Sequence, residues 1–140
     1  MSEKQFLQNY FKNLISLIDH EKYLDDLLKV KQILKETNKQ GKKTMIFGNG
    51  GSAAIASHFS VDMTKNARVR CTNYNESDLL TCFSNDFGYE HWVEKAIEYY
   101  ADTGDALILI SAGGNSANML NGAKKAKEKN NTNQTHQAWC

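Results

Sequence analysis

The sequence has no proline, so its turns must be built from glycine, asparagine and aspartate. It has only three cysteines, Cys71, Cys82 and Cys140, and none of them forms a CxxC pair. This argues against a disulfide framework and against a zinc knuckle. No apolar run approaches the roughly 18 residues that indicate a membrane span. The first residues, MSEKQFLQNYFKNL, lack a signal-peptide core, and we therefore expect a cytoplasmic protein with no membrane partner.

An excess of charge of one sign is also missing. The formal net charge of the 140 residues is +1, which gives no electrostatic reason to expect a nucleic-acid partner. The hydrophobic fraction of 41% suits one globular domain with a real core. We expect this domain to span residues 1–129, followed by a polar tail over 130–140 that is disordered, or altered by a truncation or a frameshift.

Apolar residues recur at helical spacing over 2–18 and again over about 24–38, which predicts a pair of N-terminal helices. After residue 42, apolar runs alternate with amphipathic segments. We expect strands at 43–48, 67–74 and 106–111, and helices at 52–65, 89–101 and 113–129. Residues 75–88 read as a short helix or as an extended apolar run. This alternation predicts an α/β fold, with a parallel sheet flanked by helices and ligands bound beyond the carboxyl ends of the strands.

The stretch GNGGSA, Gly48–Ala53, joins the first expected strand to a helix. Glycines let a ligand approach the backbone, and the N-terminus of the following helix attracts anions. Ser52 adds a hydroxyl group, so phosphate is the expected ligand. The alternative is a tight turn that Ser52 caps.

A second stretch, SAGGNSAN, repeats this arrangement after the third expected strand. Ser111 and Ser116 flank Gly113, Gly114 and Asn115. Two serine-bearing turns at one edge of a sheet could hold one phosphate from both sides.

Two further groups of polar residues allow a functional and a structural interpretation. His58 and Asp62 are one helical turn apart, so they could hold two corners of a zinc site or form a hydrogen-bonded pair on a partly buried face. Asn85 and Asp86 could lie on a loop that reaches back to the sheet edge. Alternatively, Asp86 could cap a helix that begins at Tyr89.

A dinucleotide site is a more remote alternative. Gly48, Gly50 and Ala53 satisfy the pattern G-x-G-x-x-A after a strand. That fingerprint also needs an acidic residue about 20 positions on, at the end of the second strand. The sequence there is ARVRCTN, which has no acidic residue.

The motifs GNGGSA, SHFSVDM, FSNDFGYE and ILISAGGNSANML, in this order, resemble the sugar isomerase (SIS) fold, a flavodoxin-like three-layer sandwich. More narrowly, the chain resembles the bacterial phosphoheptose isomerases, also called sedoheptulose 7-phosphate isomerases, from about Phe6 to Lys129. The resemblance implies a set of substrate-binding residues: Asn49, Gly50, Gly51, Ser52, Asp62, Asn85, Asp86, Ser111, Ala112, Gly113 and Ser116. It also implies His58 and Asp62 as metal ligands and Asp62 as the catalytic carboxylate.

The activity implied by the resemblance is isomerisation of sedoheptulose 7-phosphate to D-glycero-D-manno-heptose 7-phosphate through an enediol, for heptoses of bacterial surface polysaccharides. Zinc as cofactor and a homo-oligomer, usually a tetramer, belong to the same implication. The chain departs from the family where Asp62 replaces a glutamate and where Ala112 and Gly113 replace hydroxyl-bearing residues. The family's C-terminal part, with a glutamine and a histidine of the site, has no counterpart motif here. A non-catalytic sugar-phosphate-binding module is therefore the alternative function.

Overall fold

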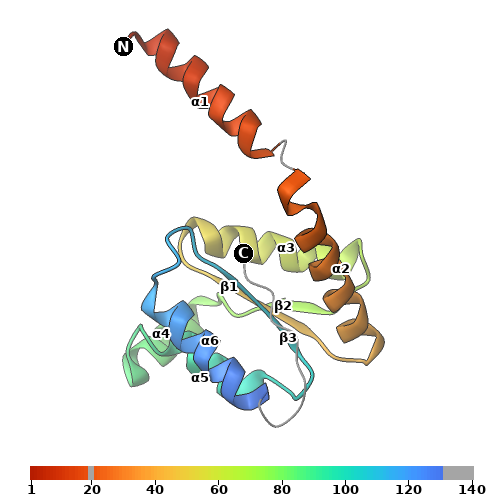
Figure 1. Ribbon diagram of the computed structural model, residues 1–140. Coiled ribbons are helices and arrows are strands. Elements are labelled where there is room, and N and C mark those ends of the chain that lie inside the picture. The colour runs from red at the N-terminus through yellow and green to blue at the C-terminus, as the bar shows by residue number, and fades with distance from the viewer. Residues whose placement is uncertain (19–20, 131–140) are drawn as a thin grey trace. The chain divides into compact units, whose positions relative to one another are not determined.

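The structure is a computed structural model that describes residues 1–18 and 21–130. The chain divides into two units, Met1–Gln32 and a larger one from Ile33 onward. The first unit holds helix α1 (Glu3–Ile18), the short 3-10 helix η1 (Glu21–Tyr23) and the start of α2 (Leu24–Lys39). Every side chain of α1 is exposed, although the helix is amphipathic. The predicted pair of N-terminal helices is confirmed (Figure 1).

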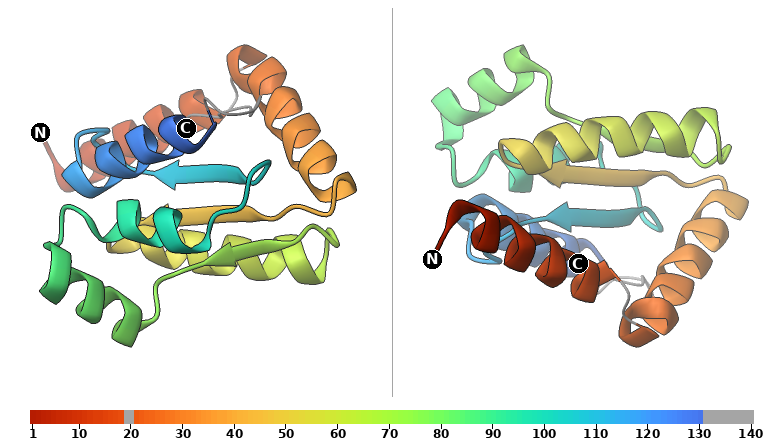
Figure 2. Two further views of the ribbon diagram at one scale, coloured as in Figure 1. Left: turned by 90° about the horizontal axis from the view of Figure 1, so that it is seen from below. Right: turned by 90° about the horizontal axis from the view of Figure 1, so that it is seen from above.

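The second unit is built on a three-stranded parallel sheet of order β2-β1-β3. Strand β1 is Thr44–Gly48, β2 is Cys71–Asn73 and β3 is Ala106–Ile110. Thr44 pairs with Cys71 on one side and with Ala106 on the other, so all three strands begin at the same level. Figure 2 shows β1 and β3 pointing the same way, with their carboxyl ends at one edge.

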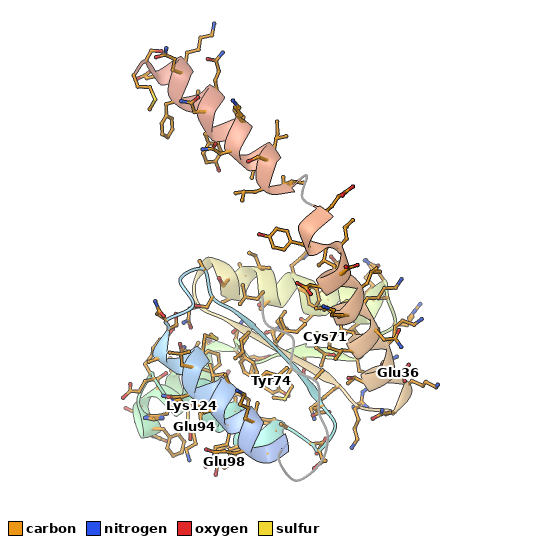
Figure 3. The ribbon with its side chains drawn as sticks, in the orientation of Figure 1. Glu36, Cys71, Tyr74, Glu94, Glu98 and Lys124 are labelled. Atoms are coloured by element: carbon orange, nitrogen blue, oxygen red, sulfur yellow. The ribbon has the colours of Figure 1, made fainter. Side chains whose placement is uncertain are left out.

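Helices cover both faces of this sheet. Helix α3 (Gly51–Lys65) packs on one face, where Ile46, Ala56 and Cys71 form a small core. Helices α5 (Trp92–Tyr100) and α6 (Ala117–Asn130) pack on the other face, over Phe47 and the fully buried Trp92. Figure 3 shows Cys71 on the α3 side of the sheet and Tyr74 on the opposite side. The predicted three-layer α/β sandwich is therefore confirmed.

The burial of β1 follows from this layering. All five of its residues are buried, because alternate side chains enter the two cores. Phe47 stacks on Tyr74 with ring centroids 5.5 Å apart and also contacts Trp92 at 5.7 Å. This aromatic cluster holds the end of β2 and the start of α5 against the central strand.

Several predicted boundaries were wrong. The strand expected over 67–74 is only Cys71–Asn73, because Arg68 adopts a left-handed backbone (φ 57°) and Val69 bonds back to the carbonyl of Met63. For residues 75–88 the helical alternative is confirmed, as α4 (Ser77–Phe87), which contacts α5. The helices expected at 89–101 and 113–129 are α5 and α6, which begin three and four residues later. Of the predicted tail, residues 131–140 lie outside the described residues.

Candidate functional site

The two glycine turns lie side by side at the carboxyl edge of the sheet. Gly48, the last residue of β1, pairs in register with Ile110, the last residue of β3. The next residues along the chain, Asn49 and Ser111, therefore leave the sheet at the same level. The register thus places both serine-bearing turns at one edge, as the sequence predicted.

The first turn can be made only by glycines at two positions. The amide of Ser52 donates to the carbonyl of Asn49 at 3.0 Å, which closes a β-turn. Gly50 occupies its first central position with φ 54° and ψ −120°, a conformation that strongly favours glycine. A Cβ atom on Gly48 would lie 2.4 Å from the backbone carbonyl of Ser52, so helix α3 approaches the strand end as closely as glycine allows.

Ser52 does not cap helix α3, so the alternative of a Ser52-capped turn was wrong. Gly50 is the N-cap residue, and its position has no side-chain cap hydrogen bond. Ser52 lies in the first turn of the helix and is half-buried. Its hydroxyl makes no hydrogen bond to any of the described residues, which leaves it able to bond to a ligand.

The second turn brings its two serines together. The hydroxyl oxygens of Ser111 and Ser116 are 3.3 Å apart, and the amide of Gly114 donates to the carbonyl of Ser111 at 3.3 Å. Gly114 has a left-handed backbone with φ 66°. Ala112 and Gly113 are exposed on the outer side of the turn.

A reciprocal amide pair connects the two turns. Asn49 Nδ2 donates to Asn118 Oδ1 at 3.0 Å, and Asn118 Nδ2 donates to Asn49 Oδ1 at 2.8 Å. Asn118 is in the first turn of α6 and is only 2% exposed. The hydroxyl of Tyr89 donates to the same Asn49 oxygen at 3.0 Å. The pair therefore joins the loop after β1 to the helix after β3.

This edge of the sheet suits an anion. The N-termini of α3 and α6 both follow strands that end here, so both positive ends of their dipoles lie at this edge. In the first turns of these helices, the backbone N–H groups of Gly51, Ala117 and Asn118 donate to none of the described residues. With the hydroxyls of Ser52, Ser111 and Ser116, these groups provide the donors that a phosphate needs.

Asparagines at the end of β2 anchor α3 to the sheet. Asn73 Nδ2 donates to Ser60 Oγ at 2.8 Å, and Asn75 Nδ2 donates to the carbonyl of Ala53 at 3.0 Å and to Ser57 Oγ at 3.2 Å. These contacts fix α3 from Ala53 to Ser60, and with it the turn that precedes the helix. The strand ends in asparagine, not in the carboxylate that a dinucleotide site needs.

His58 and Asp62 do lie together, but on an exposed face. His58 Nε2 is 3.5 Å from Asp62 Oδ2, and the side chains are 80% and 52% exposed. The alternative of a partly buried pair was therefore wrong. Ten residues of helix separate Ser52 from Asp62, about 15 Å at 1.5 Å per residue. The carboxylate is thus distant from the glycine turns along α3.

As a zinc site, this pair is incomplete within the described part of the chain. No group of three histidine, cysteine, aspartate or glutamate side chains comes together among residues 1–18 and 21–130. Zinc sites in proteins use at least three protein ligands. His58 and Asp62 by themselves do not fit a zinc ion.

Asn85 and Asp86 are not on a loop. They lie in the last turns of α4, so the expectation that Asp86 caps a helix at Tyr89 was wrong. Asn85 Nδ2 donates to Asp86 Oδ1 at 2.9 Å, and the thiol of Cys82 donates to Asp86 Oδ2 at 3.6 Å. The charge of Asp86 raises the pKa of this exposed thiol. All these contacts stay within α4, and none of the described contacts joins them to the glycine turns.

Sequence reasoning missed Asn118 and Tyr89. Both lie inside motifs that it quoted, SAGGNSAN and FSNDFGYE, but neither was given a role: Asn118 comes two residues after Ser116, and Tyr89 three residues after Asp86. Their bonds to Asn49 span 69 and 40 residues, so periodicity along the chain carries no signal of them.

None of the helices formed by the described residues has the length and apolar character needed to cross a membrane.

Comparisons with known proteins agree with this geometry. The family model described as "SIS domain" matches residues 8–132. The phosphoheptose isomerase of Campylobacter concisus is 37% identical over 116 residues, which cover 79% of this chain and 61% of the relative. That of Haemophilus ducreyi is 36% identical over 128 residues, covering 88% and 66%. The solved structure of phosphoheptose isomerase GmhA from Neisseria gonorrhoeae has a TM-score of 0.83 at 27% identity, covering 91% of this chain and 71% of that one.

This chain spans about three fifths of the length of such curated relatives, covering 61% of the phosphoheptose isomerase of Campylobacter concisus, 63% of that of Cytophaga hutchinsonii and 58% of that of Aliarcobacter butzleri.

Proposed function

We propose that this chain, which belongs to the SIS domain family, binds the phosphate of a sugar phosphate between its two glycine turns. One observation carries the proposal. The turns lie on neighbouring parallel strands, are bridged by the Asn49–Asn118 pair, and bring two helix N-termini and the hydroxyls of Ser52 and Ser116 to one edge. Such an edge offers several hydrogen-bond donors to an anion.

We propose further that the sugar phosphate is sedoheptulose 7-phosphate, interconverted with D-glycero-D-manno-heptose 7-phosphate. The support is the similarity to phosphoheptose isomerases from several bacteria. In this reaction a carboxylate takes a proton from the carbon beside the carbonyl, an enediol forms, and a second group returns a proton to the neighbouring carbon. A positioned acid or base of this kind contributes typically about 10²–10⁴-fold to the rate.

Asp62 is the proposed base. It lies about 15 Å along α3 from Ser52, although the side chain leans back toward the start of the helix. A short ligand such as inorganic phosphate therefore cannot contact both. An extended seven-carbon sugar phosphate laid along α3 reaches toward Asp62 while its phosphate stays in the turns. This spacing favours a long sugar phosphate over a triose phosphate.

Zinc, if bound, would be held by His58 and Asp62 together with ligands from beyond the described residues. When bound, it would polarise the carbonyl oxygen of the substrate. The residues described here supply only two of the ligands, so we assign no step of the reaction to the metal.

We also propose a cytoplasmic homo-oligomer, a tetramer by family resemblance, that serves the synthesis of heptoses for bacterial surface polysaccharides. The support for an oligomer is an apolar face on α1 that no described residue of the first unit covers. Its exposed large side chains are Phe6, Leu7, Tyr10, Phe11, Leu14, Ile15, Leu17 and Ile18. Light scattering at micromolar concentration should show more than a monomer, and a well-folded monomer would contradict the proposal.

A non-catalytic sugar-phosphate-binding module is the second candidate. The observation that favours it is the separation of Asp62 from the turns and the lack of a third metal ligand near His58 among the described residues. Binding and turnover therefore need separate tests.

The binding test is calorimetric titration of the purified chain with sedoheptulose 7-phosphate. Ser52→Ala and Ser116→Ala each remove a hydrogen bond to a charged group, which should weaken binding by about 1.5–3 kcal/mol. Thr103→Ala removes an exposed hydroxyl just before β3, at the opposite edge of the sheet from the turns, so it is the control and should bind like the parent. If Ser52→Ala and Ser116→Ala both bind like the parent, the phosphate does not lie between the turns.

The turnover test is interconversion of the two heptose phosphates, with and without added zinc. The isomerase proposal expects turnover that Asp62→Asn abolishes, since an amide cannot accept the proton. Binding without turnover would favour the non-catalytic module instead.

A further inference from the structure

The two turns meet at Asn49. Its side chain is half-exposed, yet it makes three hydrogen bonds to neighbouring side chains. Its Oδ1 accepts from Asn118 Nδ2 at 2.8 Å and from the hydroxyl of Tyr89 at 3.0 Å. Its Nδ2 donates to Asn118 Oδ1 at 3.0 Å. An amide oxygen has two lone pairs and an amide nitrogen two hydrogens. Both lone pairs and one hydrogen are therefore used.

The orientation of the pair is set from the Asn118 side. The backbone amide of Met119 donates to Asn118 Oδ1 at 3.0 Å, and a backbone N–H can only donate. The atom that it meets must be the oxygen of Asn118, so the nitrogen of Asn118 faces Asn49. Asn118 is 2% exposed and cannot turn over without burying an unpaired polar atom. The side-chain oxygen of Asn49 must therefore face Asn118 Nδ2.

One hydrogen of Asn49 Nδ2 remains, and no described residue accepts it. We propose that Asn118 and Tyr89 are positioning residues that lock the amide of Asn49, so that Asn49 offers a single N–H donor to an oxygen of the ligand held between the turns. Asn49 consequently selects a hydrogen-bond acceptor, such as a phosphate or carbonyl oxygen. It cannot accept a hydrogen bond from a sugar hydroxyl, because its own oxygen is already saturated.

The proposal also predicts that the two turns are coupled. Helix α6 carries Asn118 and directly follows Ser116 of the second turn, whereas Asn49 belongs to the first turn. A ligand that binds one turn therefore depends on the position of the other. The binding part of this inference rests on the function proposed above, whereas the orientation of Asn49 does not.

A double-mutant cycle tests the binding part, with sedoheptulose 7-phosphate as the titrant. Asn49→Ala and Asn118→Ala should each weaken binding about tenfold, the effect of one hydrogen bond. The double variant should be no weaker than Asn49→Ala, because Asn118 acts through Asn49. Tyr89→Phe, whose ring is half exposed, should fold like the parent and lose about threefold in affinity.

The matched control is Lys129→Met. Lys129 lies at the far end of the same helix as Asn118, and its ammonium donates to the carbonyls of Ile97, Glu98 and Ala101 at 3.1, 2.7 and 2.9 Å. This variant weakens the attachment of α6 without removing a bond to Asn49 or Tyr89, so it should bind the ligand within twofold of the parent. Full additivity of Asn49→Ala and Asn118→Ala, or an equal loss in Lys129→Met, would show that Asn118 only stabilises α6 and would overturn the proposal.

Hydrogen exchange of the Asn49 side-chain amide tests the orientation without any ligand. In the parent, one of its two protons should exchange slowly and the other quickly, and in Asn118→Ala both should exchange quickly. Two fast protons in the parent would refute the locked amide. If the parent has one slow proton but binds no sugar phosphate, the proposed function fails while the positioning role of Asn118 stands.

Discussion

A Gly48→Ala substitution should destabilise this protein far more than the loss of a glycine usually does. The new Cβ would lie 2.4 Å from the backbone carbon and oxygen of Ser52 and 2.8 Å from the amide nitrogen of Ala53. Real Cβ atoms stay beyond 3.0 Å, so helix α3 must move away by at least half an ångström. Because the obstructing atoms are backbone, no rotamer change relieves the clash.

Overpacking of a protein interior usually lowers the free energy of unfolding by about 1–3 kcal/mol, and this range applies to Gly48→Ala. We expect the upper part of this range, because α3 is also tied to β2 by Asn73 and Asn75 and cannot move alone. Urea denaturation followed by circular dichroism gives the free energy of unfolding. The same shift moves Ser52, so affinity for sedoheptulose 7-phosphate should fall together with stability.

Two neighbouring glycines supply matched controls. Gly51→Ala meets no atom within 4 Å and places alanine in the first turn of α3, so it should be neutral or up to about 1 kcal/mol stabilising. A Cβ atom on Gly50 would also meet no atom within 4 Å, but Gly50 has φ 54°. Backbone strain alone should therefore make Gly50→Ala less stable by about 1–3 kcal/mol. A Gly48→Ala variant as stable as Gly51→Ala would refute the close contact between α3 and the strand end.

Two further outcomes test the opposite edge of the sheet and the buried thiol. Asp105 is buried. It accepts from the backbone amides of Lys43 and Asp102 at 3.0 and 2.8 Å and pairs with the ammonium of Lys43. Asp105→Ala should therefore lower the free energy of unfolding, measured by urea denaturation, by about 3 kcal/mol. Asp102 is the second partner of the Lys43 ammonium and is 72% exposed, so Asp102→Ala should lower the free energy of unfolding by less than about 1 kcal/mol. Equal losses in the two variants would contradict the dominant role of the buried carboxylate. Burial raises the pKa of the Cys71 thiol from 9.0 to about 11. Between pH 9 and 11 the unfolded chain therefore loses this proton while the folded chain keeps it. The free energy of unfolding should fall over this range by on the order of 2 kcal/mol. Cys71→Ala should show a shallower fall over the same range, and an identical pH dependence in parent and variant would disprove the effect.

The parts of the fold that were predictable from the sequence depend on neighbours along the chain. The runs TMIFG and ALILI were recognisable as strands because every residue in them is apolar, small or β-branched, and a glycine-rich turn follows each. The strands are parallel because a helix separates each from the next. The glycine turns were also local features, since the constraint on Gly50 involves only its own backbone.

The errors lie where distant packing decides the local structure. Asn85 and Asp86 read as loop residues, yet α4 continues through them to Phe87. The reason is that Phe83 and Phe87 both pack on Tyr99 of the next helix, with ring centroids 5.8 and 6.5 Å away. The bridge between Asn49 and Asn118 was not predictable for the same reason, since it exists only once β1 and β3 are in register.

The arrangement of α3 has a consequence for the proposed reaction. Gly51, Ile55, His58 and Asp62 follow one another at spacings of four, three and four residues, so they form a single stripe along the helix. This stripe begins at the first glycine turn and is exposed throughout, including the large apolar side chain of Ile55. A sugar bound along it would have the helix on one side and water on the other. Isomerisation through an enediol needs protection from water, so the second wall of the proposed active site has to come from atoms outside these residues. The proposed oligomer is one source of that wall. On this proposal, the chain by itself would bind the phosphate, whereas turnover would need the assembly.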